Sequence, residues 1–189
     1  ENLKLNFHLK QLNISKFYGL MFHDSKDIFS FEKKQIKKFV LNLKKRKITK
    51  FVGISVYSPS EVKKIINFFK PDFIQFPLNI FDKRFISKEN IKFYKQRNIK
   101  LVARSCFLQG IILRRKFLFK DKKDAKIFNN FKIWLKKKKL SALSASLNFI
   151  KNQKDIDFLV IGIDNYFQLK QITEILKSKK KIDIPYFQN

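Results

Sequence analysis

The sequence predicts an α/β fold built on a parallel β-sheet. Five short apolar runs each end in polar residues, and the stretch 101–110 (LVARSCFLQG) shows the pattern most plainly. It begins with three apolar residues in a row and continues into Arg104, Ser105 and Gln109. A continuous apolar run is typical of a strand buried on both faces, and in parallel α/β folds ligands bind beyond the carboxyl ends of the strands. We therefore expect the functional site at these polar strand ends.

The elements of the first half follow in order from the spacing of apolar residues. Helical spacing predicts helices over 3–13 and 31–47, and an apolar run predicts a strand between them at 17–22. A second apolar run predicts a strand at 50–56. The following segment Ser58-Pro59-Ser60-Glu61 combines a capping serine, a proline suited to the first helical turn and a glutamate that completes a capping box. We expect a helix to begin there.

The second half continues the alternation of strands and helices. The expected strands are 72–79, 98–107 and 158–163. The expected helices are one over 122–137 and those that Ser87, Ser141 and Asn165 can cap, the last with Leu169, Ile172 and Leu176 buried. Every predicted strand is thus followed by a helix, which requires a parallel sheet with right-handed crossovers.

The order of the elements favours a (β/α)8 TIM barrel. The chain has neither a G-x-G-x-x-G nor a P-loop motif, which argues against the two common nucleotide-binding open sheets. About five βα units are present, whereas a barrel needs eight and roughly 250 residues. We expect residues 1–189 to form a single partial barrel domain, with the remaining units before residue 1.

Composition restricts the class of protein. The 189 residues are 44% hydrophobic, enough for a sizeable core. Cys106 is the only cysteine, which excludes a disulfide or a cysteine zinc site within one chain and favours a reducing, cytoplasmic location. No apolar run approaches the ~18 residues of a spanning helix. We therefore expect neither a cysteine-bound zinc nor a membrane.

The net charge of +28 has two interpretations. A basic surface can bind nucleic acid or an anionic membrane. However, only six of the 43 basic residues are arginine, the residue that best recognises phosphate, and the lysines are spread over every predicted helix. We expect a solvated lysine surface and no nucleic-acid partner, and a basic nucleic-acid or membrane-surface binder remains the less favoured alternative.

Five segments resemble the aldo-keto reductases in order and spacing. They are LKQLNISKFYGLMFHDS, KFVGISVYSPSEV, DFIQFPLNIFDKRF, LVARSCFLQGIIL and DFLVIGIDNYFQL, and they look like the fourth to eighth strands of that barrel. The resemblance implies an enzyme that reduces an aldehyde or ketone to an alcohol with NADPH and without a metal. It also implies a small-molecule carbonyl substrate, and it leaves the oligomeric state open.

The resemblance assigns roles to the polar strand ends. His23 matches the family's active-site histidine, which hydrogen-bonds the substrate carbonyl. The matching cofactor residues are Ser55 and Gln75 for the nicotinamide carboxamide, Arg104 at a ring-stacking position, Ser105, Phe107 and Gln109 for the pyrophosphate, and Gly162 and Gln168 for the adenosine.

Departures from the family pattern leave alternatives open. Asp164 and Ile172 replace the basic residue and the asparagine often found there, and an acid disfavours a 2′-phosphate. NADPH is therefore the family default, and NADH is possible. The family's catalytic tyrosine, lysine and aspartate have no counterpart here, so we expect this chain alone to be inactive. A non-catalytic nicotinamide-binding sensor or regulatory protein of the same fold is the alternative.

Overall fold

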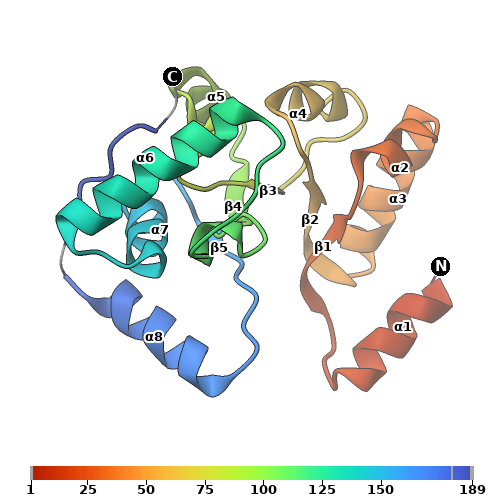
Figure 1. Cartoon of the computed structure of the whole chain (residues 1–189). Helices are drawn as coiled ribbons and strands as arrows, with labels where there is room; N and C mark the ends of the chain where they lie inside the picture. Colours follow the sequence, from red (N-terminus) through yellow and green to blue (C-terminus); the bar gives the residue numbers. More distant parts are fainter. Residues whose placement is uncertain (1, 180, 188–189) are drawn as a thin grey trace. The chain divides into compact units, whose positions relative to one another are not determined.

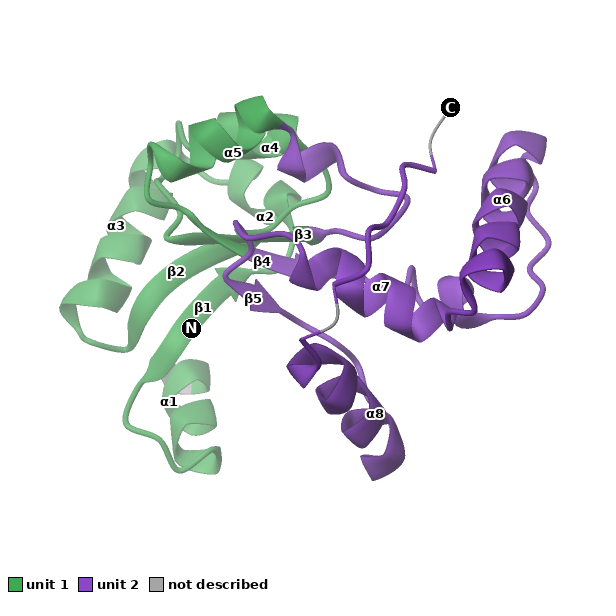
Figure 2. Cartoon of the chain, turned by 90° about the vertical axis from the view of Figure 1, so that its left-hand side faces the viewer, with its two compact units in different colours: residues 1–76, 88–101 green, residues 77–87, 102–189 purple. Residues whose placement is uncertain are grey.

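The computed structural model describes residues 2–179 and 181–187 (Figure 1). Its residues divide into two compact units, coloured in Figure 2: unit 1 comprises residues 1–76 and 88–101, and unit 2 comprises 77–87 and 102–189. The boundary between the units passes through two strands, β3 and β4.

Five strands form the sheet, in the order β1-β2-β3-β4-β5. They are β1 (Phe17–Phe22), β2 (Thr49–Ser55), β3 (Phe73–Pro77), β4 (Lys100–Arg104) and β5 (Phe158–Leu159). β1 and β2, β2 and β3, and β4 and β5 pair in parallel. Helices follow the strands in turn, so the predicted α/β fold with a parallel sheet is confirmed.

Backbone hydrogen bonds within each unit mark the neighbouring strands β3 and β4. In unit 1, the Lys100 N–H donates to the Asp72 carbonyl at 2.9 Å, at the start of both strands. In unit 2, the Leu78 N–H donates to the Arg104 carbonyl at 3.0 Å, at their end. The strand order therefore follows the chain order, as in a barrel of successive βα units.

Unit 1 contains five helices among its described residues. They are α1 (Asn2–Gln11), α2 (Ser25–Phe29), α3 (Lys33–Lys45), α4 (Pro59–Ile65) and α5 (Lys88–Lys95). The helix α3 buries Ile36, Val40 and Leu43, which recur at helical spacing, and presents lysines on its other face. Its Lys44 makes an ion pair with Asp72, whose carboxylate also accepts the Val52 N–H at 2.7 Å. This pair joins α3 to the sheet beside the start of β3.

The short helix α2 is absent from the sequence prediction. It has five residues and is capped by Asp24, whose side chain accepts the Lys26 N–H at 2.9 Å. Ser25 and Ile28 are its buried residues. One helical turn offers too few positions for an apolar period, so only the capping aspartate could have indicated it.

Two glycines of unit 1 make room for one aromatic ring. Gly53 pairs with Phe73 across β2 and β3, and a Cβ added at Gly53 would lie 2.4 Å from the Phe73 ring. At Gly19, on β1, the corresponding distance is 3.1 Å. The ring of Phe73 therefore lies over the backbone of the two neighbouring strands, where only glycine leaves it enough space.

Replacing Gly53 by alanine is expected to destabilise the full protein by about 1–3 kcal/mol, because the new methyl group displaces the Phe73 ring. Urea unfolding of the wild type and the variant measures the change. Gly162→Ala is the matched control, since a Cβ at Gly162 meets no atom within 4 Å. Equal stability of G53A and wild type would show that the ring moves aside freely.

Unit 2 contains three α-helices and two short 3₁₀ helices among its described residues. They are η1 (Arg84–Ile86), η2 (Ile111–Leu113), α6 (Lys122–Lys138), α7 (Ala142–Lys151) and α8 (Tyr166–Lys177). In α7, every residue from Ala145 to Ile150 is buried. Phe131 of α6 is 0% exposed and packs against Phe81 and Phe187, with ring centroids 5.3 Å away in both cases. The half-buried ring of Phe187, in the C-terminal segment, thus packs against the core of unit 2.

Two details of unit 2 differ from the sequence prediction. β4 ends at Arg104 and β5 spans two residues, whereas longer strands were expected for both runs. In the last helix Ile172 is buried, but Leu169 and Leu176 are 44% and 36% exposed, so their predicted burial is wrong. The helix α8 contacts α7, and the side that carries Ile172 is the covered one. No helix of the described ranges is both long and apolar enough to cross a membrane.

Candidate functional site

Three predicted site residues occupy the carboxyl ends of neighbouring strands in unit 1. His23 follows β1 by one residue, Ser55 ends β2, and Gln75 lies in β3. The register pairs Ser55 with Gln75, and it pairs Phe22 with Ile54 one residue before His23 and Ser55. Paired residues of parallel strands share a face of the sheet. The backbone therefore places Ser55 and Gln75 side by side, with His23 at the same level of the next strand.

These three residues differ in their exposure to solvent. Ser55 is 2% exposed and Gln75 is half-buried, whereas His23 is exposed. The Gln75 carbonyl accepts the Val56 N–H at 2.9 Å, which fixes its backbone against β2. A hydroxyl and an amide together offer donors and acceptors that complement a ligand amide, and an exposed imidazole can reach a small substrate.

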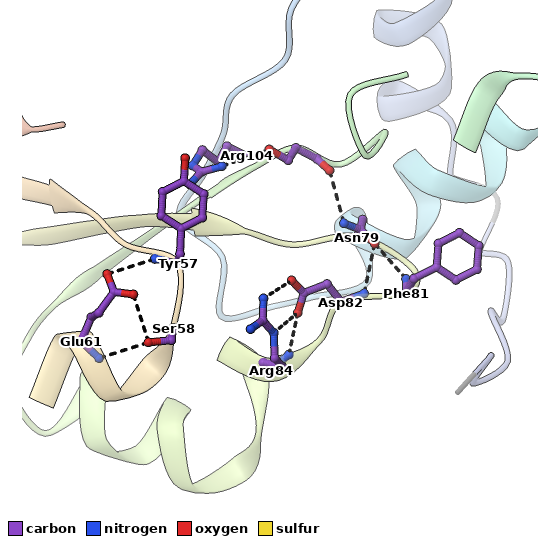
Figure 3. Close-up of polar contacts among 9 residues, drawn as sticks. Tyr57, Ser58, Glu61, Asn79, Phe81, Asp82, Arg84 and Arg104 are labelled. Atoms are coloured by element: carbon purple, nitrogen blue, oxygen red, sulfur yellow. Dashed lines mark hydrogen bonds and ion pairs between the residues drawn. The ribbon is translucent and has the colours of Figure 1, made fainter. Parts of the chain in front are cut away.

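Glu61 ties the segment after His23 to the start of α4. Its backbone N–H donates to the Ser58 hydroxyl at 3.4 Å, which confirms the predicted cap (Figure 3). Its carboxylate accepts the Ser25 hydroxyl at 2.8 Å, the Ser58 hydroxyl at 3.1 Å and the Tyr57 N–H at 3.3 Å. In a capping box the Glu61 carboxylate would accept the backbone N–H of Ser58. In the structure it accepts instead the backbone N–H of Tyr57, the residue before the cap. One carboxylate thus joins the start of α2 to the two residues that precede α4.

In unit 2, the turn after β4 has an unusual backbone. Ser105, Leu108, Gln109 and Gly110 have φ values of 58°, 48°, 53° and 83°. Left-handed conformation costs a residue other than glycine roughly 1–2 kcal/mol. Strain of this kind is concentrated at ligand sites, where the surrounding structure holds it. The backbone conformation of the turn 105–110 is therefore one that its own residues do not favour, and contacts with the rest of unit 2 must stabilise it.

The same turn presents backbone donors. Leu108 donates its N–H to the Ser105 carbonyl at 2.9 Å and closes the turn. Among the residues that the structure describes, the N–H groups of Phe107, Gln109 and Gly110 have no protein acceptor. Neighbouring unpaired N–H groups in a turn form a concavity that binds anions, phosphate in particular.

Asn79 holds this turn in place. Its side chain is 1% exposed, and its Oδ1 accepts the N–H groups of Phe81 and Asp82 at 2.9 Å and 3.0 Å (Figure 3). Its Nδ2 donates to the Ser105 carbonyl at 3.4 Å. Asn79 is the last residue of the strand expected over 72–79, and its hydrogen bonds make it a positioning residue for the turn 105–110.

A cavity of about 520 Å³ in unit 2 adjoins this turn. It is bounded by the turn 105–110, the segment 160–164 and the start of α8. Five of the predicted cofactor residues line it: Ser105, Phe107, Gln109, Gly162 and Gln168. Segments separated by some 50 residues of chain therefore contribute to one cavity, and the volume is in the usual range for small-molecule sites.

The start of α8 is organised by hydrogen bonds at the rim of the cavity. The Asn165 side chain caps the helix by accepting the Gln168 N–H at 3.0 Å. The Gln168 side chain accepts the Asp164 N–H at 2.8 Å, and its Nε2 donates to the Asp164 carboxylate at 3.4 Å. The amide of Gln168 thus fixes Asp164, which the sequence prediction did not foresee.

Of the two residues on either side of Ser105, Cys106 lines the cavity and Arg104 does not. Arg104 is half-buried and its Nη1 donates to the Ser105 hydroxyl at 3.2 Å, but its side chain is not part of the cavity lining. Cys106 lines the cavity and is buried, and burial raises the pKa of its thiol to about 11. The thiol is therefore neutral near pH 7 and acts as a small packing group, not as a nucleophile.

The structure separates the predicted site residues by unit. Those of unit 1 lie at three adjacent strand ends, and those of unit 2 lie at or beside one cavity. Sequence reasoning missed Leu113, Leu143 and Gln171, which also line the cavity from η2, α7 and α8. Within the described ranges, no three His, Cys, Asp or Glu side chains come together as a possible metal site.

Five parallel strands, each followed by a helix, with polar groups at their carboxyl ends, define an α/β protein of the (β/α)8-barrel type, incomplete in this chain. The model of the Aldo/keto reductase family matches residues 4–184, so the chain belongs to that family. The resemblance inferred from the five sequence segments is confirmed. Comparison with curated proteins found no similar sequence.

Solved structures show the same fold. The apo form of aldo-keto reductase AKR11C1 from Bacillus halodurans is 16% identical and has a TM-score of 0.74, covering 96% of this chain and 63% of its own. Its holo form has a TM-score of 0.71 at 16% identity, covering 95% and 62%. The glycerol dehydrogenase AKR11B4 from Gluconobacter oxydans has a TM-score of 0.60 at 17% identity, covering 98% and 66%. This chain therefore spans less than two thirds of the length of each.

Proposed function

We propose that the full protein reduces an aldehyde or ketone to an alcohol with a nicotinamide dinucleotide. The observation that carries the proposal is the cavity of unit 2, where five residues predicted for the cofactor lie together around unpaired backbone donors. Membership of the Aldo/keto reductase family supports the reaction class. In this proposal, residues 1–189 form one partial barrel domain of the enzyme. The enzyme would act in the cytoplasm on a small carbonyl compound.

The residues present fit a dinucleotide cofactor. Its pyrophosphate carries negative charge on oxygens that accept hydrogen bonds, which suits the N–H groups of Phe107, Gln109 and Gly110. Gly162 leaves open space, since a Cβ there would meet no atom within 4 Å. The start of α8, which has no acidic residue in its first turn, also lines the cavity through Gln168. Residues 105–110 would hold the pyrophosphate, and Gly162 and Gln168 would adjoin the adenosine.

For unit 1 by itself, resemblance to the family assigns the nicotinamide to the strand ends. Ser55 and Gln75 would bond the carboxamide and so fix which ring face meets the substrate. The bound nicotinamide supplies a hydride. His23 would donate an N–H to the substrate carbonyl oxygen and stabilise its developing negative charge. The proton is assigned to a tyrosine outside these 189 residues, by resemblance to the family.

The test uses the full natural protein and two separate measurements. Calorimetry measures binding of NADPH and NADH, and loss of the reduced-nicotinamide absorbance measures turnover with a panel of aldehydes and ketones. Binding together with turnover supports the proposal. Binding without any turnover would favour a nicotinamide-binding regulatory protein, and absence of binding would overturn the proposal. Association with DNA that persists at moderate salt would favour the basic-surface alternative.

A further inference from the structure

The charge of the cavity in unit 2 is opposite to that of the chain. Of the 189 residues 43 are basic and 15 are acidic, yet the described residues that line the cavity include no lysine or arginine. Asp164 is the one charged residue among them. The chain has a net charge of +28, and the cavity is proposed to hold an anionic cofactor. Its described lining nevertheless contains a carboxylate and no side-chain cation.

Asp164 is held in its position by its neighbours. Its backbone N–H donates to the Gln168 Oε1 at 2.8 Å, and its carboxylate accepts the Gln168 Nε2 at 3.4 Å. It directly precedes Asn165, the cap of the twelve-residue helix α8. A carboxylate at this point interacts favourably with the partial positive charge of the helix start. It thereby occupies the position at which the helix start would otherwise attract a phosphate group.

We propose that Asp164 makes this cavity select NADH over NADPH. The inference rests on the proposed function, because it concerns the adenosine end of the same cofactor. NADPH differs from NADH by a 2′-phosphate on the adenosine ribose, which Asp164 repels without a nearby lining cation to compensate. NADH presents a 2′-hydroxyl, which can donate to a carboxylate, the arrangement by which other dinucleotide sites select NAD.

The geometry supports contact between Asp164 and that ribose. The turn 105–110 and the segment 160–164 line the same cavity, and Asp164 lies between Gly162 and Gln168 in the chain. A cofactor whose pyrophosphate binds the turn and whose adenosine adjoins Gly162 and Gln168, as proposed above, would therefore bring its ribose close to Asp164. The side-chain amide of Gln168, on α8, holds the Asp164 carboxylate in place. Asp164 nevertheless remains exposed to solvent. Solvent screening reduces the repulsion of the phosphate but does not remove it.

The experiment measures binding by calorimetry on the full natural protein, with NADH and NADPH and with the adenosine fragments 5′-AMP and 2′,5′-ADP. We expect NADH to bind about tenfold more tightly than NADPH, and 5′-AMP more tightly than 2′,5′-ADP. Asp164→Asn keeps the shape and the Gln168 contact but removes the charge, so the ratio should approach one. Asp183→Asn, at an exposed aspartate of unit 2 outside the cavity, is the control and should leave the ratio unchanged.

Each outcome decides the inference. Tighter binding of NADPH by the wild type, or an unchanged ratio in D164N with an unchanged melting temperature, would overturn the role of Asp164 and leave the proposed function intact. Failure of both NADH and NADPH to bind would overturn the inference together with the proposed function. The fragments 5′-AMP and 2′,5′-ADP carry no nicotinamide, so their ratio reports on the adenosine end independently of turnover.

Discussion

Replacing His23 by alanine in the full protein is expected to lower the turnover number for carbonyl reduction about 100- to 1000-fold, the usual effect of losing one oxyanion donor. The affinity for the nicotinamide cofactor should change less than about twofold, because the imidazole is assigned to the substrate carbonyl and not to the cofactor. His23 is exposed at the end of β1, so its removal leaves the core of unit 1 unchanged.

Steady-state kinetics with a reactive aldehyde and calorimetry with the cofactor separate the two effects. His8 is the chain's other histidine and lies exposed on α1, so His8→Ala is the matched control and should retain turnover. Equal losses of turnover and cofactor affinity in H23A would show that the imidazole positions the cofactor or the fold. Full activity of H23A would remove His23 from the site.

Elements with a strong local signal were predicted closely. β1 spans Phe17–Phe22 as expected, because a continuous apolar run bounded by polar residues indicates a strand without tertiary information. The burial that such a run implies is not found, since the residues of β1 are half-buried or exposed. The start of α4 was also correct, since the Ser58 side chain accepts a backbone N–H and Pro59 lacks the N–H that would be left unpaired in the first turn. The end of β4 was placed too late, because the apolar Phe107 and the small Ser105 give no sign of a left-handed backbone. That conformation is imposed by neighbours such as Asn79.

The candidate site was predicted where it depends on strand ends and missed where it depends on packing. Ser105, Gln109 and Gly162 follow apolar runs, and such positions converge at one edge of any parallel sheet. Leu143 and Gln171 reach the cavity from helices, and their spacing is that of ordinary helical residues. No local pattern distinguishes them from core positions, so only the folded arrangement of α7 and α8 reveals their place.

Gly162 offers the most direct test of the cavity itself. It lines the cavity, and a Cβ added there would meet no atom within 4 Å, so a larger side chain can be introduced without a clash with the fold. Replacing Gly162 by phenylalanine places a ring in the space assigned to the cofactor. We expect the affinity for NADH to fall about 100-fold or more, while the free energy of unfolding stays within about 0.5 kcal/mol of the wild type.

Calorimetry with NADH and urea unfolding measure the two quantities on the same preparations. Gly162→Ala adds one methyl group and should reduce the affinity only slightly, so the size of the side chain and not the loss of glycine is tested. Gly162 and His23 belong to different units. We therefore expect G162F to weaken cofactor binding more than it lowers the turnover number at saturating cofactor. An unchanged affinity in a well-folded G162F protein would mean that the cofactor binds outside this cavity, and the roles proposed for the turn 105–110 would fall with it.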